Sequence, residues 1–322
     1  MYHSFNNVKF NLSVLLISLQ IYKSLKQYFL ILNIGGKKMN DSCTVVTFGN
    51  FKGGTGKTTN STMIAYCLAK MGYKVLLSDQ DPQANATSLY LRTKTHLEDE
   101  ITSFEKTLMS AIQSEDLKSI ITPIKENLFL LPSFSDFALY PKFLEKKFPS
   151  EVDRVQFFSS LLQPLKKEFD FIFIDVPPTF SIITDSALYA SQYVVVVLQT
   201  QERSLQGAEA FTQYLQTLID DYDADLDILG ILPVLLKNQA AVDTLTLENA
   251  KEMFGEHNLF RGIVKNMERL KRFDMTGITE DDMHDRNVIS NYTVIANEFL
   301  ERLQAVTAPS DFPLPKEANL DV

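Results

Sequence analysis

The chain of 322 residues is 45% hydrophobic and 22% charged, a composition that supports a large buried core and excludes a disordered chain. Its net charge of −9 argues against a protein that coats nucleic acid through overall charge, although a local basic segment can still bind phosphates. The two cysteines, Cys43 and Cys67, form no C-x-x-C pair, which excludes a disulfide framework and a zinc or iron–sulfur site.

The first forty residues differ from the rest in charge, with five lysines and no acidic residue. Residues 11–34 are strongly apolar, but glutamines and lysines interrupt the run, which disfavours a transmembrane helix. Gly-Gly-Lys-Lys-Met at 35–39 is what a translated ribosome-binding site followed by a start codon would give. We therefore interpret 1–40 as a leader, explained either by a start codon assigned too early or by a packing or interfacial helix.

Residues 44–60 (TVVTFGNFKGGTGKTTN) read as a buried strand, a glycine-rich turn and a helix. Glycines let backbone N–H groups approach an anion closely, and the N-terminus of a helix directs unpaired amides toward the same point. The sequence therefore predicts a phosphate-binding loop. Within it, Lys57 is expected to reach the β- and γ-phosphates of a nucleotide, and the Thr58 hydroxyl to bind Mg²⁺.

The turn departs from the ordinary pattern G-x-x-x-x-G-K-[ST]. Phe51 stands where that pattern has its first glycine, and a second lysine, Lys52, follows it. Lys52 lies on the wrong side of the loop to serve only its own nucleotide, so its cation could complete a charge clamp across a dimer interface. The alternative is a solvated lysine beside a glycine turn.

Strand and helix patterns alternate from 44 to 304 without a linker, which predicts parallel strands joined by helices. The expected strands after the first are 74–79, 127–132, 169–175, 193–198, 226–236 and 259–264. The expected helices are 57–71, 152–165, 201–219, 243–254 and 291–303, with a helical, polar stretch at 93–127 and a loop-rich one at 133–149. We expect one α/β P-loop NTPase domain over 41–304, with a mostly parallel, twisted sheet and helices on both faces. An acidic, disordered tail is expected at 305–322.

Two of these strands end in acidic residues, and the carboxyl ends of parallel strands face the ligand crevice. Asp175 ends the strand FIFID and is the candidate for the acid that helps to hold Mg²⁺. Asp81 is the candidate for orienting the attacking water. Asp79 is a metal-site candidate and, with equal weight, a turn or cap residue.

Three motifs occur in this order: KGGTGKTT at 52–59, LLSDQDPQANAT at 76–87 and FIFIDVPP at 171–178. With them the chain resembles the ParA/MinD group of deviant Walker-type ATPases over 44–304, and most of all the ParA-type ATPases that partition plasmids and chromosomes. The resemblance implies a cytoplasmic, nucleoid-associated ATPase that dimerises with ATP and Mg²⁺. The dimer would bind non-specific DNA and leave it after hydrolysis stimulated by a centromere-binding, ParB-like partner.

The resemblance also implies roles for single residues. Lys52 would cross to the partner's nucleotide, Lys57 would be the phosphate-loop lysine, Asp81 would position water, and Asp175 would be the Walker B acid. Because a cation supplied across an interface is worth about 10³–10⁵ in rate, an isolated subunit should be nearly idle. The implied nucleotide contacts are Gly53, Gly54, Thr55, Gly56, Lys57, Thr58 and Thr59.

A basic segment at 261–272 (RGIVKNMERLKR) holds five basic residues against one acid. The resemblance places DNA contacts there, although partition ATPases usually have Ile-Pro-Arg where this chain has Val-Lys-Asn at 264–266. A solvated basic face is the alternative interpretation. The candidate DNA contacts are Lys265, Arg269, Lys271 and Arg272.

Two other functions compete with this one. A MinD-like ATPase would use a basic amphipathic helix at its C-terminus to bind membranes, but 305–322 is acidic and contains three prolines, so we expect no stable membrane association. A transcriptional regulator that uses ATP as a switch would be supported by a helix-turn-helix module, and 1–40 shows no such pattern.

Overall fold

The computed structural model describes residues 43–98, 104–235, 237, 241–307 and 312–313. The leader expected at 1–40 and most of the tail expected at 305–322 lie outside these residues. The strands are β1 (Thr44–Gly49), β2 (Val75–Asp79), β3 (Thr122–Lys125), β4 (Leu128–Leu131), β5 (Phe171–Asp175), β6 (Tyr193–Gln199) and β7 (Asp227–Val234). The α-helices are α2 (Lys57–Lys70), α3 (Asn85–Glu98), α4 (Leu108–Gln113), α5 (Tyr140–Lys147), α6 (Glu151–Leu162), α7 (Ile182–Ala190), α8 (Glu202–Tyr222), α9 (Ala241–Phe254), α10 (Glu268–Thr276) and α11 (Met283–Val306).

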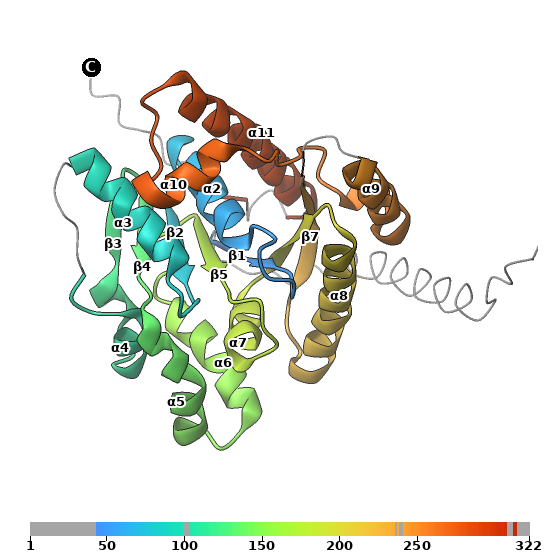
Figure 1. The fold of residues 1–322 in the computed structure, drawn as a ribbon. Coiled ribbons are helices and arrows are strands. Elements are labelled where there is room, and N and C mark those ends of the chain that lie inside the picture. The colour runs from blue at the N-terminus through green and yellow to red at the C-terminus, as the bar shows by residue number, and fades with distance from the viewer. Residues whose placement is uncertain (1–42, 99–103, 236, 238–240, 308–311, 314–322) are drawn as a thin grey trace, which may run out of the picture. The chain divides into compact units, whose positions relative to one another are not determined.

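The described strands form one sheet in the order β3-β4-β2-β5-β1-β6-β7 (Figure 1). All neighbouring pairs are parallel except β3 with β4. In the register, Asp175 of β5 pairs with Phe48 of β1 on one side and with Asp79 of β2 on the other. The phosphate loop and the two acidic strand ends therefore meet at the same edge of the sheet, as the sequence predicted.

Both faces of the sheet are covered, which confirms the expected α/β fold class. Alternate residues of β1 point to opposite faces: Val46 and Phe48 pack in a core with α2 and α11, whereas Val45 packs in a second core with α6 and α7. Figure 1 shows α2 and α11 on one face of the sheet and α6 and α7 on the other. A third core lies between β6, β7 and α8.

Some elements differ from those expected. The stretch 133–149, expected to be loop-rich, contains α5, because its proline stands in the first turn of the helix, where a missing N–H costs no hydrogen bond. The strand expected at 259–264 forms only two isolated bridges, Leu259 with Ile231 and Val264 with Val234. The last helix begins earlier than expected, at Met283. None of the helices in the described residues is long and apolar enough to cross a membrane.

Candidate nucleotide site

The glycine-rich loop between β1 and α2 has the backbone shape of an anion cradle. Gly54 and Gly56 have φ angles of 73° and 94°, in the left-handed region that favours glycine. No side chain caps the N-terminus of α2, and its first turn contains no acidic residue, so its amides face the loop unpaired. The Thr55 hydroxyl is buried without a hydrogen-bond partner within the described residues. This arrangement fits a phosphate group.

Lys57 directly follows this loop as the first residue of α2 and is only 7% exposed. Burial lowers the pKa of its ammonium, while the nearby carboxylates of Asp175 and Asp81 raise it. A buried cation without a directly bonded anion is costly, and a triphosphate would offset that cost. The contact of Lys57 with the β- and γ-phosphates stays a prediction, and its burial beside the glycine loop is compatible with it.

The end of β5 provides the oxygen atoms of the predicted magnesium site. The Thr58 hydroxyl donates a hydrogen bond of 2.7 Å to Asp175 Oδ2, and the Ser61 hydroxyl donates one of 3.3 Å to Asp175 Oδ1. Burial and, to a smaller extent, the nearby Asp79 raise the pKa of Asp175 to about 8, against the opposing effects of Thr58 and Lys57. A bound Mg²⁺ would favour the ionised carboxylate, and a hydroxyl beside a carboxylate is a donor set that Mg²⁺ accepts.

Asp79 is fully buried, and hydrogen bonds engage both of its carboxylate oxygens. Oδ2 accepts from the Thr87 backbone N–H at 2.8 Å and from the Thr87 hydroxyl at 2.7 Å, and Oδ1 accepts from the Asp81 N–H at 3.1 Å. Burial raises the pKa of Asp79 to about 6, against the effect of these bonds. Asp79 thus anchors the loop that carries Asp81 to the first turn of α3, which is the turn-residue interpretation of the sequence.

Two residues of this site were not predicted. Ser61 lies one turn after Thr58 on α2. The T-x-x-S spacing could therefore have indicated that both hydroxyls face the same carboxylate. Thr87 lies at the end of the DPQANAT motif, and its hydroxyl also accepts a hydrogen bond of 2.9 Å from the Ser133 N–H. Nothing in the local sequence links Thr87 to Ser133.

Hydrogen bonds through the Asn50 side chain fix the backbone of Lys52. Its N–H donates to Asn50 Oδ1 at 2.8 Å, and Asn50 Nδ2 donates to the carbonyl oxygens of Val197 and Ser204 at 2.9 and 3.3 Å. The Lys52 side chain is half-buried, and its ammonium forms no ion pair with any residue that the structure describes. A fixed backbone thus carries a side chain that can reach outward.

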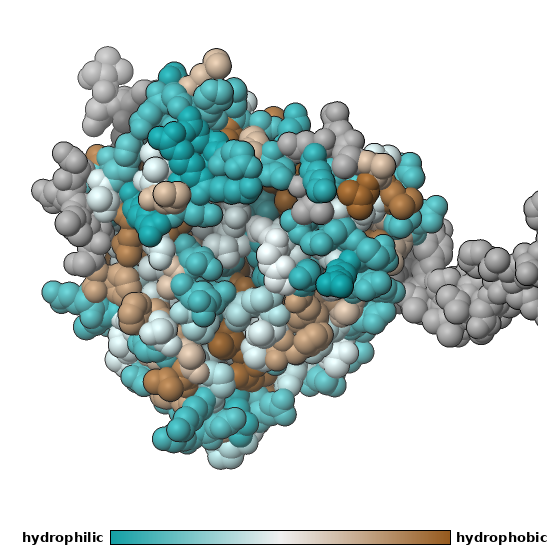
Figure 2. Space-filling model, in the orientation of Figure 1, coloured by the Kyte–Doolittle hydropathy of each residue, from teal (hydrophilic) through white to brown (hydrophobic). Residues whose placement is uncertain are grey.

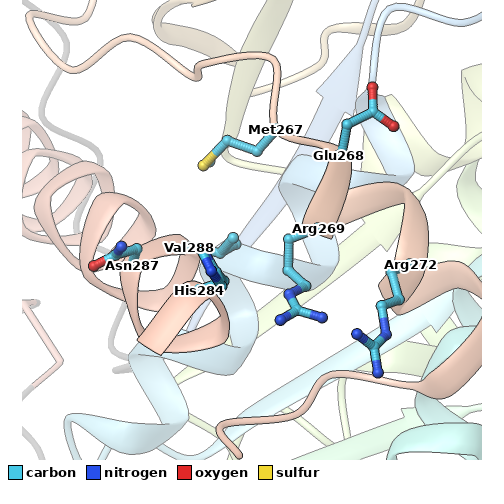
Figure 3. Close-up of a pocket in the computed structure, with 7 residues that line it drawn as sticks. All are labelled: Met267, Glu268, Arg269, Arg272, His284, Asn287 and Val288. Carbon is cyan, nitrogen blue, oxygen red and sulfur yellow. The ribbon is translucent and has the colours of Figure 1, made fainter. Parts of the chain in front are cut away.

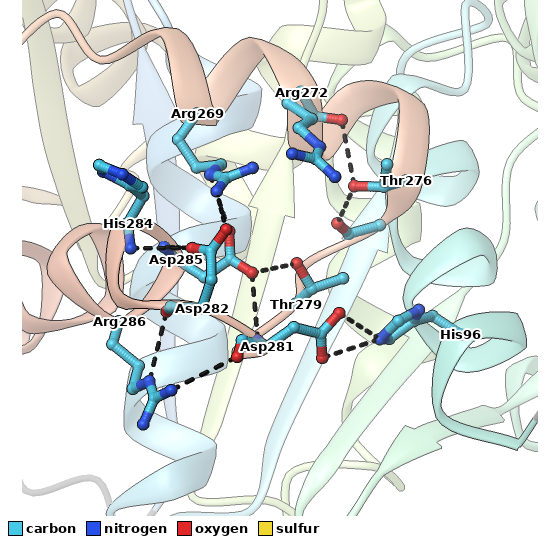
Figure 4. Close-up of polar contacts among 11 residues, drawn as sticks. His96, Arg269, Arg272, Thr276, Thr279, Asp281, Asp282, His284, Asp285 and Arg286 are labelled. Atoms are coloured by element: carbon cyan, nitrogen blue, oxygen red, sulfur yellow. Dashed lines mark hydrogen bonds and ion pairs between the residues drawn. The ribbon is translucent and has the colours of Figure 1, made fainter.

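The basic segment is only partly available at the surface. Arg269 is 14% exposed; its guanidinium forms an ion pair with Asp282 and a second one of 2.9 Å with Asp285, which ties α10 to the start of α11 (Figure 4). The DNA contact of Arg269 stays a prediction, and it would require the guanidinium to leave the two carboxylates that occupy it in this conformation. Lys265, Lys271 and Arg272 are exposed. Figure 2 shows a largely hydrophilic surface over α10 and α11.

A pocket of about 450 Å³ lies beside these residues, between α10 and the start of α11. Figure 3 shows Arg269 and Arg272 projecting from α10 next to it. Glu268 also lines the pocket and accepts a hydrogen bond of 2.8 Å from Lys271. The exposed basic groups at this surface therefore stand among acids, and the pocket is not a purely cationic site. Its lining residues are Met267, Glu268, Arg269, Arg272, His284, Asn287 and Val288.

Comparisons with known proteins agree with this site. The family model described as an AAA domain matches residues 43–228. The sporulation initiation inhibitor protein Soj of Bacillus subtilis is 29% identical over 227 residues, which are 70% of this chain and 85% of Soj. A virulence plasmid ParA family protein of Chlamydia psittaci is 33% identical over 193 residues, 58% of this chain and 67% of that protein.

Solved structures share the fold. A plasmid partition protein of Borrelia burgdorferi superposes with a TM-score of 0.66 at 23% identity, over 80% of this chain and 99% of that one. Cobyrinic acid a,c-diamide synthase of Mycobacterium smegmatis superposes with a TM-score of 0.67 at 22% identity, over 82% and 97%. The fold is therefore shared by enzymes of different function, and the sequence relatives decide between them. The chain belongs to the ParA/Soj-type family of partition ATPases.

Proposed function

We propose that this protein is a Mg²⁺-dependent ATPase that partitions DNA, and that it works as an ATP-bound homodimer. The observation that carries the proposal is the 2.7 Å contact between Thr58 and Asp175, placed directly beside buried Lys57 and the open glycine loop. The Borrelia protein was solved with AMPPNP and the Mycobacterium synthase with an ATP analogue and magnesium, which supports ATP and Mg²⁺ as the ligands.

In this proposal the chain's residues divide the work of phosphoryl transfer. The amides of the glycine loop and the Lys57 ammonium bind the phosphate oxygens, and Thr58 and Asp175 hold the metal. Asp81 lies one turn of loop beyond Asp79, which fixes its backbone, so Asp81 can orient a water molecule. When bound, Mg²⁺-ATP supplies the electrophilic phosphoryl group. Lys52 of each protomer then stabilises the charge on the partner's nucleotide.

Replacing Asp81 with alanine tests the water-positioning role. We expect ATP to bind with unchanged affinity and turnover to fall by about 10²–10⁴-fold, the usual contribution of a positioned acid or base. The variant should remain on DNA once loaded with ATP. Phosphate release and DNA retention measure the two effects, with Asp153→Ala, an exposed acid of α6, as the control. Normal hydrolysis by Asp81→Ala would reject the assigned role.

DNA binding is proposed for the exposed residues Lys265, Lys271 and Arg272, with Arg269 holding α10 in place. Six such groups in a dimer give a slope of about −5 for log K against log salt concentration. In Lys271→Glu/Arg272→Glu, four of these contacts are lost, so we expect the slope to approach about −2. Fluorescence anisotropy with duplex DNA measures it.

The matched control for this measurement is Lys142→Glu/Lys146→Glu, which reverses two exposed charges on α5, on the opposite face of the sheet. It should keep the parent slope. If both double variants show the same slope as the parent, the α10 surface does not bind DNA.

We further propose that a centromere-binding, ParB-like protein stimulates hydrolysis and that the ATP-bound dimer associates with the nucleoid.

A further inference from the structure

Four aromatic rings pack together beside Lys52, and we call them the aromatic cluster: Phe51, Phe180, Phe211 and Tyr214. Phe51 is the residue that replaces the first glycine of the ordinary phosphate loop. Its ring stacks on Phe180, with 3.4 Å between ring centroids and 29° between planes. Phe180 lies in the loop that follows Asp175. The stack therefore joins the loop of Lys52 to the loop that leaves the magnesium site.

Helix α8 provides the other wall of the cluster. Phe51 meets Phe211 edge-on at 4.9 Å and Tyr214 at 5.4 Å, and Phe180 meets Tyr214 at 5.1 Å with the planes 88° apart. The Tyr214 hydroxyl donates to Asp185 of α7. These edge-to-face geometries are the favourable ones for aromatic pairs. The cluster is thus a defined packing arrangement between three elements.

Helix α8 also restricts the backbone next to the cluster. Helix α8 passes so close that a Cβ added at Gly207 would lie 2.8 Å from Asn50 Oδ1 and 3.2 Å from Lys52 Cβ. Asn50 itself is bonded to β6 and α8. Lys52 therefore follows directly on a hydrogen-bonded asparagine and a stacked phenylalanine, and these contacts restrict its main chain.

Phe180 is 60% exposed, although it belongs to this ordered cluster. A phenylalanine that served only the core would be buried, since most of its stabilising effect comes from area removed from water. Here one face of the ring covers Phe51, and the rest of the side chain is exposed to solvent. The position suits a contact that sets the geometry of the loop.

We propose that Phe51 and Phe180 are positioning residues for ATP turnover: their stack fixes the backbone from which Lys52 reaches the partner's nucleotide. This inference rests on the proposed role of Lys52. Small displacements of a charge-stabilising group lower the rate of the chemical step, whereas nucleotide affinity depends mainly on the glycines and Lys57, which follow the stacked residue in the loop. Loss of the stack should therefore lower kcat and leave KM for ATP unchanged.

The variants Phe51→Leu and Phe180→Leu keep an apolar side chain but remove the stack. We expect each to lower the kcat for ATP hydrolysis by about 3- to 10-fold. The double variant should be no slower than the slower single one, because both changes remove the same contact. Phe180→Tyr preserves the ring and should retain the parent kcat. Phe129→Leu breaks another aromatic pair, the edge-to-face contact of Phe129 with Phe169 just before β5, and serves as the control.

A spectroscopic measurement checks the stack itself. The chain contains no tryptophan, so Phe180→Trp introduces a single reporter. Its emission should be quenched less by acrylamide than that of Phe180→Trp/Phe51→Ala, because Phe51 covers one face of the ring. Equal quenching in the two variants would show that the stack does not exist in solution and would overturn the proposal.

The outcomes separate this inference from the proposed function. If Lys52→Ala is inactive but both leucine variants turn over like the parent, Lys52 keeps its role and the positioning by the aromatic cluster is rejected. If Lys52→Ala is fully active, the proposed role of Lys52 is rejected, whatever the leucine variants do. If kcat falls and KM stays constant in both leucine variants, and Phe180→Tyr retains the parent kcat, the inference is supported.

Discussion

Replacing Lys52 with alanine is expected to lower ATP turnover by about 10³-fold or more, because a cation supplied across an interface contributes about 10³–10⁵ to the rate of phosphoryl transfer. The backbone of Lys52 is held by Asn50, so the substitution removes the ammonium and leaves the loop in place. Nucleotide affinity should therefore stay close to that of the parent. Steady-state turnover and calorimetric titration with AMPPNP measure the two quantities, and Lys167→Ala, an exposed lysine before β5, is the control.

Mixing two inactive variants shows whether Lys52 acts on its own nucleotide or on the partner's. In a mixed dimer of Lys52→Ala and Asp81→Ala protomers, the second protomer supplies Lys52 to the first, whose Asp81 is intact. One site in each mixed dimer is then complete, and random pairing should restore up to about a quarter of the parent activity. No recovery, with dimers shown to form, would mean that Lys52 serves the nucleotide of its own subunit.

Replacing Lys57 with alanine has the second large effect expected, on binding rather than on turnover. The ammonium can make several charge-assisted hydrogen bonds with phosphate oxygens, each worth about 1.5–3 kcal/mol, so AMPPNP affinity should fall by at least about 10²-fold. Calorimetric titration measures the change, and Lys52→Ala serves as the matched lysine variant that still binds.

The same substitution should not destabilise the nucleotide-free protein. Burial lowers the pKa of Lys57, which means that the folded state disfavours its charge, so removal of the ammonium relieves this cost. Because the substitution also removes the packing of the buried lysine stem, the free energy of unfolding without nucleotide should change little. A loss of stability as large as the loss of affinity would show that Lys57 has a structural role instead of binding phosphate.

The site combines predictable and unpredictable parts. The glycines and Lys57 were predictable because a phosphate loop is a local structure in which a strand, a turn and a helix follow each other directly. Asp175 was predictable because parallel strands that each precede a helix end at the same edge of the sheet. The part played by Asp79 was not decided, since its hydrogen bonds to Thr87 and Asp81 depend on how the loop after β2 turns into α3.

The number of charged residues in the segment 261–272 was a poor guide to the charge of the folded surface. Five basic residues against one acid suggested a cationic surface, but the acids that neutralise Arg269 come from Asp282 and Asp285, beyond the segment that was counted. Helix α10 folds back on the start of α11 and brings these charges together. Net charge along a sequence window therefore overestimates the charge that a folded surface presents.

The sequence alone determined the strand, turn and helix of the phosphate loop, the five other parallel strands of the sheet and the acids at the strand ends, because each depends on a pattern within a few residues. Only the tertiary structure decided that Arg269 is an internal tie, that Thr58 and Ser61 both bond Asp175, and that Phe51 stacks on Phe180. These contacts join residues far apart along the chain. Their existence depends on the packing of whole elements, and no local pattern encodes it.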